Sequence, residues 1–560
     1  MQRHPLSPFR LLPLVLAALG HSATAQQLPS AGGQLQQIPP APVPPRAAPQ
    51  ISIVPGTSPA TTSADGAKIL IKAVRISGAT AYAENELLAL TGFKPGTELT
   101  LADLRAMAAR IAERLRSDGY FLAQAYLPAQ DVNDGVVTIA VLEGRYGQVV
   151  LRNETRLSDA LINAELAGLD RGTAITMAPL ESRLLLLSDI PGVTVSSTLV
   201  PGASVGASDL VVDVKPGQGI TGSIDADNAG NRYTGIYRAG ATLNLNNPTG
   251  QGDVASIRVL TSGSGLNYAR ASYQTRLGRV TAGLAYSRLH YALGSEFKGL
   301  RASGDADIAS IYASTPLVRS RNSNLYAQVA FDAKTFSDRV DSASTLSDKK
   351  AQVLMASLRG DHADTIGHGG STSFWATGSV GNIDIGSAAM RAQDAATARS
   401  NGRFEKVAFN VARLQTVSDS VSVYAALTGQ IASKNLDVSE KMEFGGVDGV
   451  RAYPEGEAHG DRGYLLAVEA RWRLPAFSSE QPGQLQLVGF VDAGRVTLNQ
   501  TPWAPGTNRR TLTGAGVGLN WVGYQNVVVR FSYARRLGDE PAQSAPDRSG
   551  RVWLQVIKYF

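Results

Sequence analysis

The stretch LQLVGFVDAG, residues 485–494, places apolar or small side chains at every second position. Successive side chains of a β-strand point to opposite faces of the sheet. One face carries Leu485, Leu487, Gly489, Val491 and Ala493, and the opposite face includes Gln486, Phe490 and Asp492. The first face suits lipid, whereas the carboxylate of Asp492 requires a polar surrounding. The stretch therefore predicts a transmembrane β-strand whose polar face points into a lumen.

The same alternation recurs from residue 218 to the end of the chain. Residues 237–246 and 515–521 repeat it clearly, and the chain ends with Val552, Leu554, Val556, Lys558 and Phe560 on one face. We predict strands that begin near residues 219, 233, 252, 266, 278, 300, 321, 349, 370, 402, 419, 461, 483, 509, 525 and 550. Single-chain bacterial barrels have an even number of strands. We therefore expect a transmembrane β-barrel of about 16 antiparallel strands over residues 218–560.

The N-terminus has the pattern of a secretory signal peptide over residues 1–25. Arg3 and Arg10 precede or flank a short apolar run at residues 11–19, and residues 23–25 read Ala-Thr-Ala. We expect cleavage before Gln26. Residues 26–66 are rich in Pro, Gln, Ala and Ser, which predicts a linker with a possible plug region. A short helix over residues 33–37 is possible there.

Two compact units are predicted between this linker and the barrel, at residues 67–146 and 147–217. The first reads as a strand (69–76), two helices (82–90 and from Thr100 to Gly119) and two strands (123–128 and 136–143). The second repeats that β-α-α-β-β order with strands at 149–151, 193–199 and 209–214 and helices at 157–166 and 178–187. The repeat lies in the topology, with little residue identity between the two units.

The composition argues against several classes of function. The chain has no Cys, and its net charge of +6 is not concentrated in a basic run, so we expect no disulfides and no nucleic-acid partner. No run of about 18 apolar residues follows the signal peptide, which argues against helical spans. A G-x-S-x-G match at Ser204 precedes a strand rather than the helix that a hydrolase needs, so we interpret it as a hairpin tip.

Metal and nucleotide chemistry are also not expected. His362, Asp364 and His368 lie in the segment DHADTIGHGG, which we interpret as a solvated turn between two barrel strands. The sequence has no H-E-x-x-H motif and no P-loop. We predict a protein that is not an enzyme and that has no cofactor or metal site.

A long Gly-rich segment, GGVDGVRAYPEGEAHGDRGY at residues 445–464, separates two predicted barrel strands. We predict that residues 434–460 form a loop that folds inward. Its Arg451 and the wall residue Asp492 can then pair within the lumen, because a guanidinium donates two hydrogen bonds to one carboxylate in a fixed geometry. Such a pair would tie the loop to the barrel wall.

The motifs VRAYPEGEA, GDRGY and FVDAG resemble the two characteristic motifs of two-partner-secretion transporters, the haemolysin-secretion and filamentous-haemagglutinin transporter family of the BamA-like superfamily. Residues 119–147 also resemble the first POTRA domain of that family. The resemblance implies a loop tip formed by Val450, Arg451 and Tyr453 and a wall motif formed by Phe490, Asp492 and Gly494. Ala452 replaces the usual Gly of the loop motif.

The resemblance further implies an outer-membrane protein with two POTRA domains in the periplasm. Its expected partners are outer-membrane lipids and a secreted exoprotein client with an N-terminal secretion domain, which would pass through the barrel without ATP. An outer-membrane protein assembly factor of the same superfamily is the main alternative. A passive porin and a membrane-bound hydrolase are further alternatives.

Overall fold

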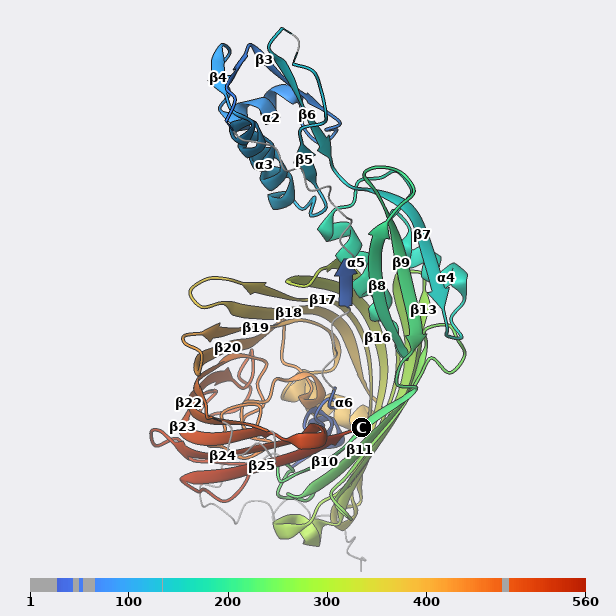
Figure 1. Ribbon diagram of the computed structural model, residues 1–560. Helices are drawn as coiled ribbons and strands as arrows, with labels where there is room; N and C mark the ends of the chain where they lie inside the picture. Colours follow the sequence, from blue (N-terminus) through green and yellow to red (C-terminus); the bar gives the residue numbers. More distant parts are fainter. Residues whose placement is uncertain (1–27, 44–49, 54–65, 133, 476–482) are drawn as a thin grey trace, which may run out of the picture.

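The protein is described here by a computed structural model that covers residues 28–43, 50–53, 66–132, 134–475 and 483–560. Its largest part is a closed barrel of sixteen strands, β10 to β25, each antiparallel to its neighbours, with β10 paired to β25 (Figure 1). The predicted barrel and its strand number are confirmed. The predicted signal peptide lies outside the described residues.

The barrel strands have the following bounds: β10 Ile220–Asp227, β11 Arg238–Asn246, β12 Val254–Thr261, β13 Leu266–Leu277, β14 Val280–Ala292, β15 Ala302–Arg319, β16 Ser323–Val340, β17 Thr345–Asp364, β18 Gly370–Ile385, β19 Gly402–Thr416, β20 Val421–Ala432, β21 Arg462–Arg473, β22 Gln484–Thr497, β23 Arg509–Val522, β24 Val527–Arg536 and β25 Gly550–Tyr559.

Two predicted starts were clearly displaced. β17 begins at Thr345 rather than near residue 349, and β11 begins at Arg238 rather than near residue 233. Residues 233–237 precede the strand, and the hydroxyl of Thr234 there donates to Gln34 at 2.7 Å.

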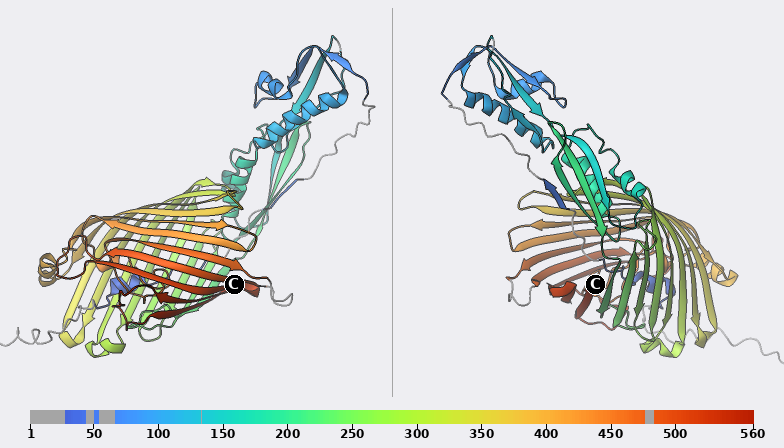
Figure 2. Two further views of the ribbon diagram at one scale, coloured as in Figure 1. Left: turned by 90° about the vertical axis from the view of Figure 1, so that its left-hand side faces the viewer. Right: turned by 45° about the vertical axis from the view of Figure 1, so that its right-hand side comes forward.

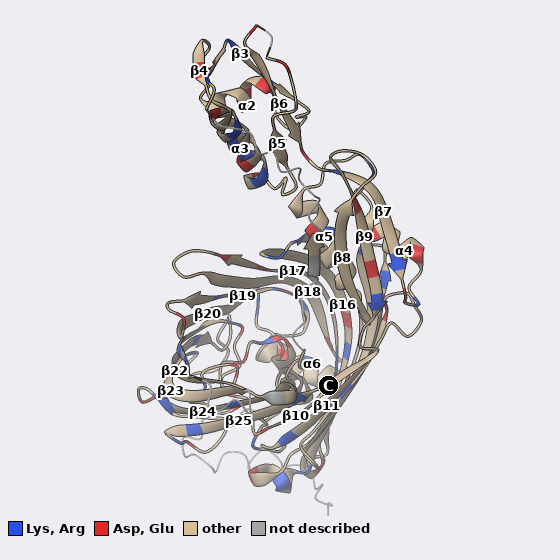
Figure 3. Ribbon diagram, in the orientation of Figure 1, with Lys and Arg blue, Asp and Glu red and all other residues tan. Residues whose placement is uncertain are grey.

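Alternation along the strands sorts side chains between lumen and exterior as expected. In β22, Phe490 and Asp492 are buried, whereas Leu487 and Val491 on the other face are exposed. Along the strands most positions are uncharged (Figure 3), and the exposed ones include Leu284, Val329 and Val517. This arrangement leaves an apolar band around the outside of the barrel.

The first unit before the barrel contains β2 Ile69–Ile71, β3 Ala73–Ser77, α2 Glu84–Thr91, β4 Thr97–Leu99, α3 Leu101–Ser117, β5 Gln124–Tyr126 and β6 Val136–Leu142. The predicted strand at 69–76 is two strands, because the backbone N–H groups of Lys72 and Ala73 both donate to the carbonyl of Gly135. Helix α3 begins with a capping box, in which Thr100 and Asp103 bond each other's backbone N–H. Its apolar face packs on the β3-β6-β5 sheet.

The second unit contains β7 Arg145–Asn153, α4 Asp159–Leu166, α5 Met177–Ser188, β8 Val193–Pro201 and β9 Ala207–Pro216. Strand β7 therefore begins before the predicted boundary at residue 147. The segment with Ser204 connects β8 to the antiparallel β9, so it is a hairpin tip with no helix behind the serine. This geometry does not support the hydrolase alternative.

The segment DHADTIGHGG is only partly a turn. His362 and Asp364 belong to the end of β17, and the turn itself lies between Asp364 and Gly370. The two oxygens of Asp364 accept from the guanidinium of Arg413 at 2.8 and 3.1 Å. The carboxylate thus has a partner on the wall, in keeping with a structural role.

The N-terminal segment enters the barrel. Helix α1 Ala31–Gln36 lies within the barrel, where it appears dark blue (Figures 1 and 2). The predicted position, residues 33–37, was shifted because Ser30 caps the helix by accepting from the N–H of Gly33. Farther along, β1 Gln50–Ile53 pairs in parallel with β8, which extends the second sheet to the order β1-β8-β9-β7. No helix in the described ranges is long and apolar enough to cross a membrane.

The two units project from one end of the barrel, and the second unit is fastened to that end (Figure 2). Arg276 of β13 donates to Glu165 of α4 at 3.0 Å, and Arg319 at the end of β15 forms a two-pronged pair with Asp189 at 2.7 and 2.9 Å. Arg321 also binds Glu181 at 2.7 Å. Burial raises the pKa of Glu165, and the nearby charge of Arg276 opposes that rise.

Candidate functional site: the inward loop, its seat on the wall and the plug helix

The chain between β20 and β21, residues 433–461, folds back into the barrel and is called the inward loop here. Its Phe444, Val450 and Tyr453 are fully buried. They pack with Phe490, Val496 and Leu512 of the wall in one apolar cluster. The loop that the sequence predicted at 434–460 therefore occupies the lumen.

Arg451 at the tip of the inward loop binds the wall through several contacts. Its Nε and Nη2 donate to the two oxygens of Asp492 at 2.8 and 2.7 Å, and its backbone N–H donates to Oδ2 at 3.1 Å. Its Nη1 donates to Glu469 of β21 at 2.8 Å. The guanidinium also lies 3.5 Å from the centre of the Phe490 ring, a cation–π contact. The structure thus brings together the residues predicted for this pair.

Two further wall residues that bind the tip were not predicted. Glu469 is directly opposite Phe490 across β21 and β22, and the alternation of β21 would have placed it in the lumen. Trp553 of β25 donates its indole N–H to the carbonyl of Arg451 at 2.7 Å. The tip is therefore held by three wall strands, two of which carry a carboxylate.

Two wall glycines make room for the tip. A Cβ placed on Gly514 of β23 would lie 2.6 Å from the Cβ of Ala452, and a Cβ on Gly494 would lie 3.2 Å from Cγ2 of Val450. Ala452 does not adopt a positive φ, so the turn does not require glycine at that position. The methyl group of Ala452 fits because Gly514 has no side chain.

The second half of the loop is tied through Glu457 to β23 and to the connection between β24 and β25, at the same rim as the base of the loop. This carboxylate is fully buried and accepts from Arg510 of β23 at 2.6 Å. It also accepts from the backbone N–H groups of Gln543 and Ser544 in the connection between β24 and β25. Tyr453 donates its hydroxyl to the carbonyl of Glu540 in the same connection at 2.9 Å.

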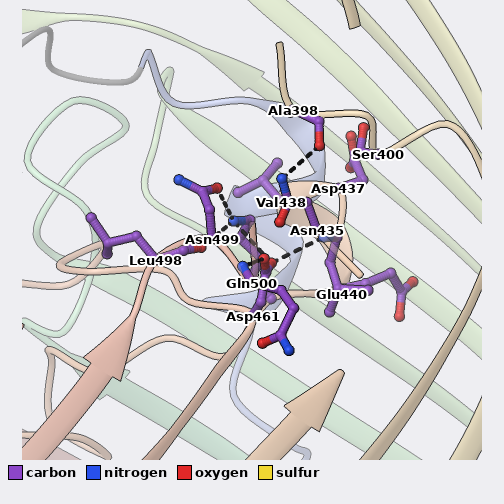
Figure 4. A network of polar contacts seen from close by, with 12 residues as sticks. Ala398, Ser400, Asn435, Asp437, Val438, Glu440, Asp461, Leu498, Asn499 and Gln500 are labelled. Atoms are coloured by element: carbon purple, nitrogen blue, oxygen red, sulfur yellow. Dashed lines mark hydrogen bonds and ion pairs between the residues drawn. The ribbon is translucent and has the colours of Figure 1, made fainter. Parts of the chain in front are cut away.

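The base of the loop is held by a polar network around Asp461 (Figure 4). Asp461 is fully buried and accepts from the N–H groups of Leu436 and Gln500 at 3.0 and 2.6 Å. Lys441 pairs with the same carboxylate at 3.0 Å. Asn435 bridges to Ala398 and Thr501. Both ends of the loop are thereby fixed to neighbouring connections at the same rim.

A short 3-10 helix near the base, η3 Val438–Glu440, meets lysines from three wall strands. Lys334 of β16 and Lys406 of β19 bind Glu440 at 2.8 and 2.9 Å, and Lys349 of β17 binds Asp437 at 2.7 Å. These groups are largely buried, and each has a direct partner of opposite charge, with Glu440 shared by two lysines. The lysine side chains anchor this part of the loop across the barrel.

The plug helix α1 contacts both the inward loop and the wall. Ala31 donates its N–H to Asp338 of β16 at 2.8 Å, and the side chain of Gln36 donates to the carbonyl of Val438 in η3 at 2.9 Å. A Cβ on Gly32 would lie 2.7 Å from the Cβ of Ser439. The helix therefore rests on η3, so the plug and the loop share one contact surface.

A cavity of about 730 Å3 remains between these segments and the wall. Its lining includes residues 39–43 beyond the plug helix, together with Asp227, Arg238, Glu469 and Arg530. These side chains make the space polar. It is far smaller than a folded domain, which limits what the lumen accommodates with plug and loop in place.

A closed sixteen-stranded barrel, an inward loop bound to its wall and two small α+β units at one rim define an outer-membrane barrel transporter with POTRA domains. A family model described as "Haemolysin secretion/activation protein ShlB/FhaC/HecB" matches residues 206–521, and one described as "POTRA domain, ShlB-type" matches residues 69–144. The first match covers more than half of the chain, so the chain belongs to the ShlB/FhaC/HecB family of haemolysin secretion/activation proteins. The predicted family resemblance is confirmed.

Individual relatives agree with this assignment. The heme/hemopexin transporter protein HuxB of Haemophilus influenzae strain 86-028NP is 29% identical over 475 residues, which cover 83% of this chain and 82% of that protein. The solved structure of CdiB from Escherichia coli matches with a TM-score of 0.69 and 22% identity, covering 90% of this chain and 93% of CdiB. BamA from Haemophilus ducreyi lacking POTRA domains 1–3 matches with a TM-score of 0.53 and 16% identity over 88% of this chain and 100% of that chain, a likeness of fold alone. The protein is an outer-membrane secretion transporter with its POTRA domains in the periplasm.

Proposed function

We propose that this protein secretes one cognate exoprotein, whose N-terminal secretion domain is captured in extended form by the POTRA units. The observation that carries this proposal is the edge of β8, which already pairs with the extended segment β1 over residues 50–53. An edge that pairs with one added strand can pair with a different extended segment through the same backbone groups. Side-chain pockets beside the edge then supply specificity. The client would replace β1 at this edge.

The captured chain would then pass through the lumen. The plug helix and the inward loop occupy that lumen, and the remaining cavity is polar. Passage of an unfolded polypeptide therefore requires both segments to move. The loop can do so if the pair between Arg451 and Asp492 opens. The sequence has no P-loop, and folding of the client outside the cell would oppose its return.

The roles of the motif residues follow from these contacts. Val450, Arg451 and Tyr453 would seat the loop tip, and Phe490, Asp492 and Gly494 would form the receiving wall. In this account the seated tip defines the closed state. A lysine at 451 would keep the charge but lose the two-pronged geometry.

Arg451→Ala tests the proposal when secreted client and barrel level in the membrane are measured together. We expect secretion to fall at least tenfold with a normal amount of folded barrel, an intermediate loss for Arg451→Lys, and no change for Arg403→Ala at an exposed surface arginine. Normal secretion by Arg451→Ala would show that the contacts of Arg451 at the loop tip are not needed for secretion. Depletion of many other outer-membrane proteins on deletion of the gene would favour an assembly factor instead.

A further inference from the structure

Three arginines lie close together on the outer surface of the barrel, at the rim opposite the POTRA units. Arg462 begins β21, Arg495 lies near the end of β22, and Arg509 begins β23. Arg462 and Arg509 are both paired in register with Thr497, and Arg495 lies between Tyr464 and Thr511. We call these three residues the arginine patch.

The patch faces outward and is open to its surroundings. On β22 Gly494 is buried and the side chain of Val496 faces the lumen, so the side chains of Arg495 and Thr497 point to the exterior. All three arginines are exposed. Neighbouring strands are about 4.8 Å apart, so the backbones of Arg462 and Arg509 are about 10 Å apart with Arg495 between them. Their long side chains can converge on one group.

No carboxylate balances the patch within the described part of the chain. The side chains of Arg462, Arg495 and Arg509 form no ion pair or hydrogen bond with any residue that the structure describes. Three other outward arginines on the same rim differ in this respect. Arg288 is 3.4 Å from Asp305, Arg339 is 3.2 Å from Asp341, and Arg403 is 3.3 Å from Glu405. The cationic charge of the patch is therefore left for an external partner.

The residues below the patch fit the boundary of a lipid leaflet. From the rim inward, the outward face of β21 carries Arg462, Tyr464, Leu466 and Val468. The last three are 48%, 43% and 39% exposed. Tyrosine is enriched at the head-group level of membranes, with apolar side chains facing the acyl region. The arginines thus lie at the height of lipid head groups, directly above an acyl-facing surface.

We propose that the arginine patch binds the phosphates of a glycolipid in the outer leaflet of the outer membrane, a lipid A type of molecule. Arginine forks match phosphate oxygens geometrically, and basic clusters beside an apolar surface attract anionic lipids. A bisphosphorylated disaccharide can span the separation between Arg462 and Arg509. The bound lipid would then fix the orientation of the sector β21–β23, which carries Asp492 and Glu469 on its inner face.

Native mass spectrometry of the full-length protein in detergent tests this proposal with bisphosphorylated lipid A as the probe. We expect the variant Arg462→Gln/Arg495→Gln/Arg509→Gln to retain at least tenfold less lipid than the natural protein. The matched control Arg288→Gln/Arg339→Gln/Arg403→Gln removes three outward arginines that already have carboxylate partners, and it should retain lipid fully.

Two further arms separate the possible sources of phosphate. Lipid A without its phosphates should bind the natural protein and the patch variant equally weakly, and millimolar inorganic phosphate should not displace the bound lipid. Equal lipid loss in both triple variants, retention of dephosphorylated lipid by the natural protein as strong as that of bisphosphorylated lipid A, or full displacement by inorganic phosphate would each overturn the proposal. If the triple variant does not fold, Arg495→Gln alone should still lower retention severalfold, and unchanged retention would count against the patch.

Discussion

The inward loop and the plug helix both occupy the lumen, but they are held there by different contacts. The loop is fixed at its tip, its second half and its base by buried charged groups with direct partners, including Arg451, Glu457 and Asp461. The plug helix has six residues, no charged side chain and only a few hydrogen bonds to the wall and the loop. The loop is thus held mainly by buried charge pairs and the plug helix by packing and a few hydrogen bonds, so we expect the plug helix to leave the lumen more readily than the loop.

Removal of the carboxylate at the base should have the largest effect. Asp461→Ala leaves Lys441 buried beside an empty site and removes the acceptor for two backbone N–H groups. Breaking such a pair costs about 3–5 kcal/mol. We expect a marked fall in the thermal midpoint of the barrel, followed by heat-modifiability on gels. Asp539→Ala, at an exposed position in the connection between β24 and β25, should leave the midpoint unchanged.

A smaller effect is expected where the tip meets the wall. Gly514→Ala places a methyl group 2.6 Å from the Cβ of Ala452, and overpacking of this kind costs about 1–3 kcal/mol. We expect weaker seating of the loop and greater protease sensitivity at the tip. The double variant Gly514→Ala/Ala452→Gly should restore the natural cleavage rate. Failure of the second substitution to rescue the first would show that the close approach does not hold the tip.

The plug side of the comparison can be probed with two adjacent glycines. Gly32→Ala brings a methyl group within 2.7 Å of the Cβ of Ser439, whereas the corresponding methyl at Gly33 has its nearest neighbour at 3.5 Å. Both substitutions raise helix propensity by about 1 kcal/mol, so propensity does not distinguish them. We expect higher single-channel conductance in planar bilayers for Gly32→Ala only. Equal conductance of the two variants would contradict the view that close contact between Gly32 and η3 holds the plug helix in place.

The smallest expected effect concerns β1, the strand that follows the plug helix in the chain. Deletion of residues 50–53 frees the edge of β8 without changing the barrel. We expect the full-length protein to bind the client's N-terminal secretion domain roughly tenfold more tightly, which corresponds to about 1.4 kcal/mol. Fluorescence anisotropy with the labelled domain measures this change. Weaker binding would mean that β1 contributes to the client site rather than competing for it.

The parts of the molecule that follow from local periodicity were predictable from the sequence. Alternation identified the sixteen strands and placed Asp492 in the lumen, and helical spacing between Thr100 and Gly119 identified α3. Pairing of Arg451 with Asp492 was also predicted, because an arginine on an inward loop and a carboxylate on the lumen face of the wall favour each other. These features depend on neighbours within about ten residues, or on strong charge complementarity.

The remaining features depend on contacts between distant segments, which no local pattern encodes. Gly514 must lack a side chain only because the loop tip reaches β23, and Lys334, Lys349 and Lys406 find their carboxylate partners only when the inward loop folds against their strands. The parallel pairing of β1 with β8 likewise requires the chain to leave the lumen and return to the second POTRA unit. Sequence periodicity gives the face of each residue but not its partner across the fold.

A double-mutant cycle at Arg451 and Asp492, followed by the thermal midpoint of the purified barrel, tests most directly whether their pair holds the loop. The account predicts that Arg451→Ala/Asp492→Ala is no less stable than Arg451→Ala alone, because the single change leaves Asp492 buried without its partner. The coupling should be about 2–3 kcal/mol. Additive losses from the two substitutions would contradict the account, since they would show that the two residues stabilise the barrel independently.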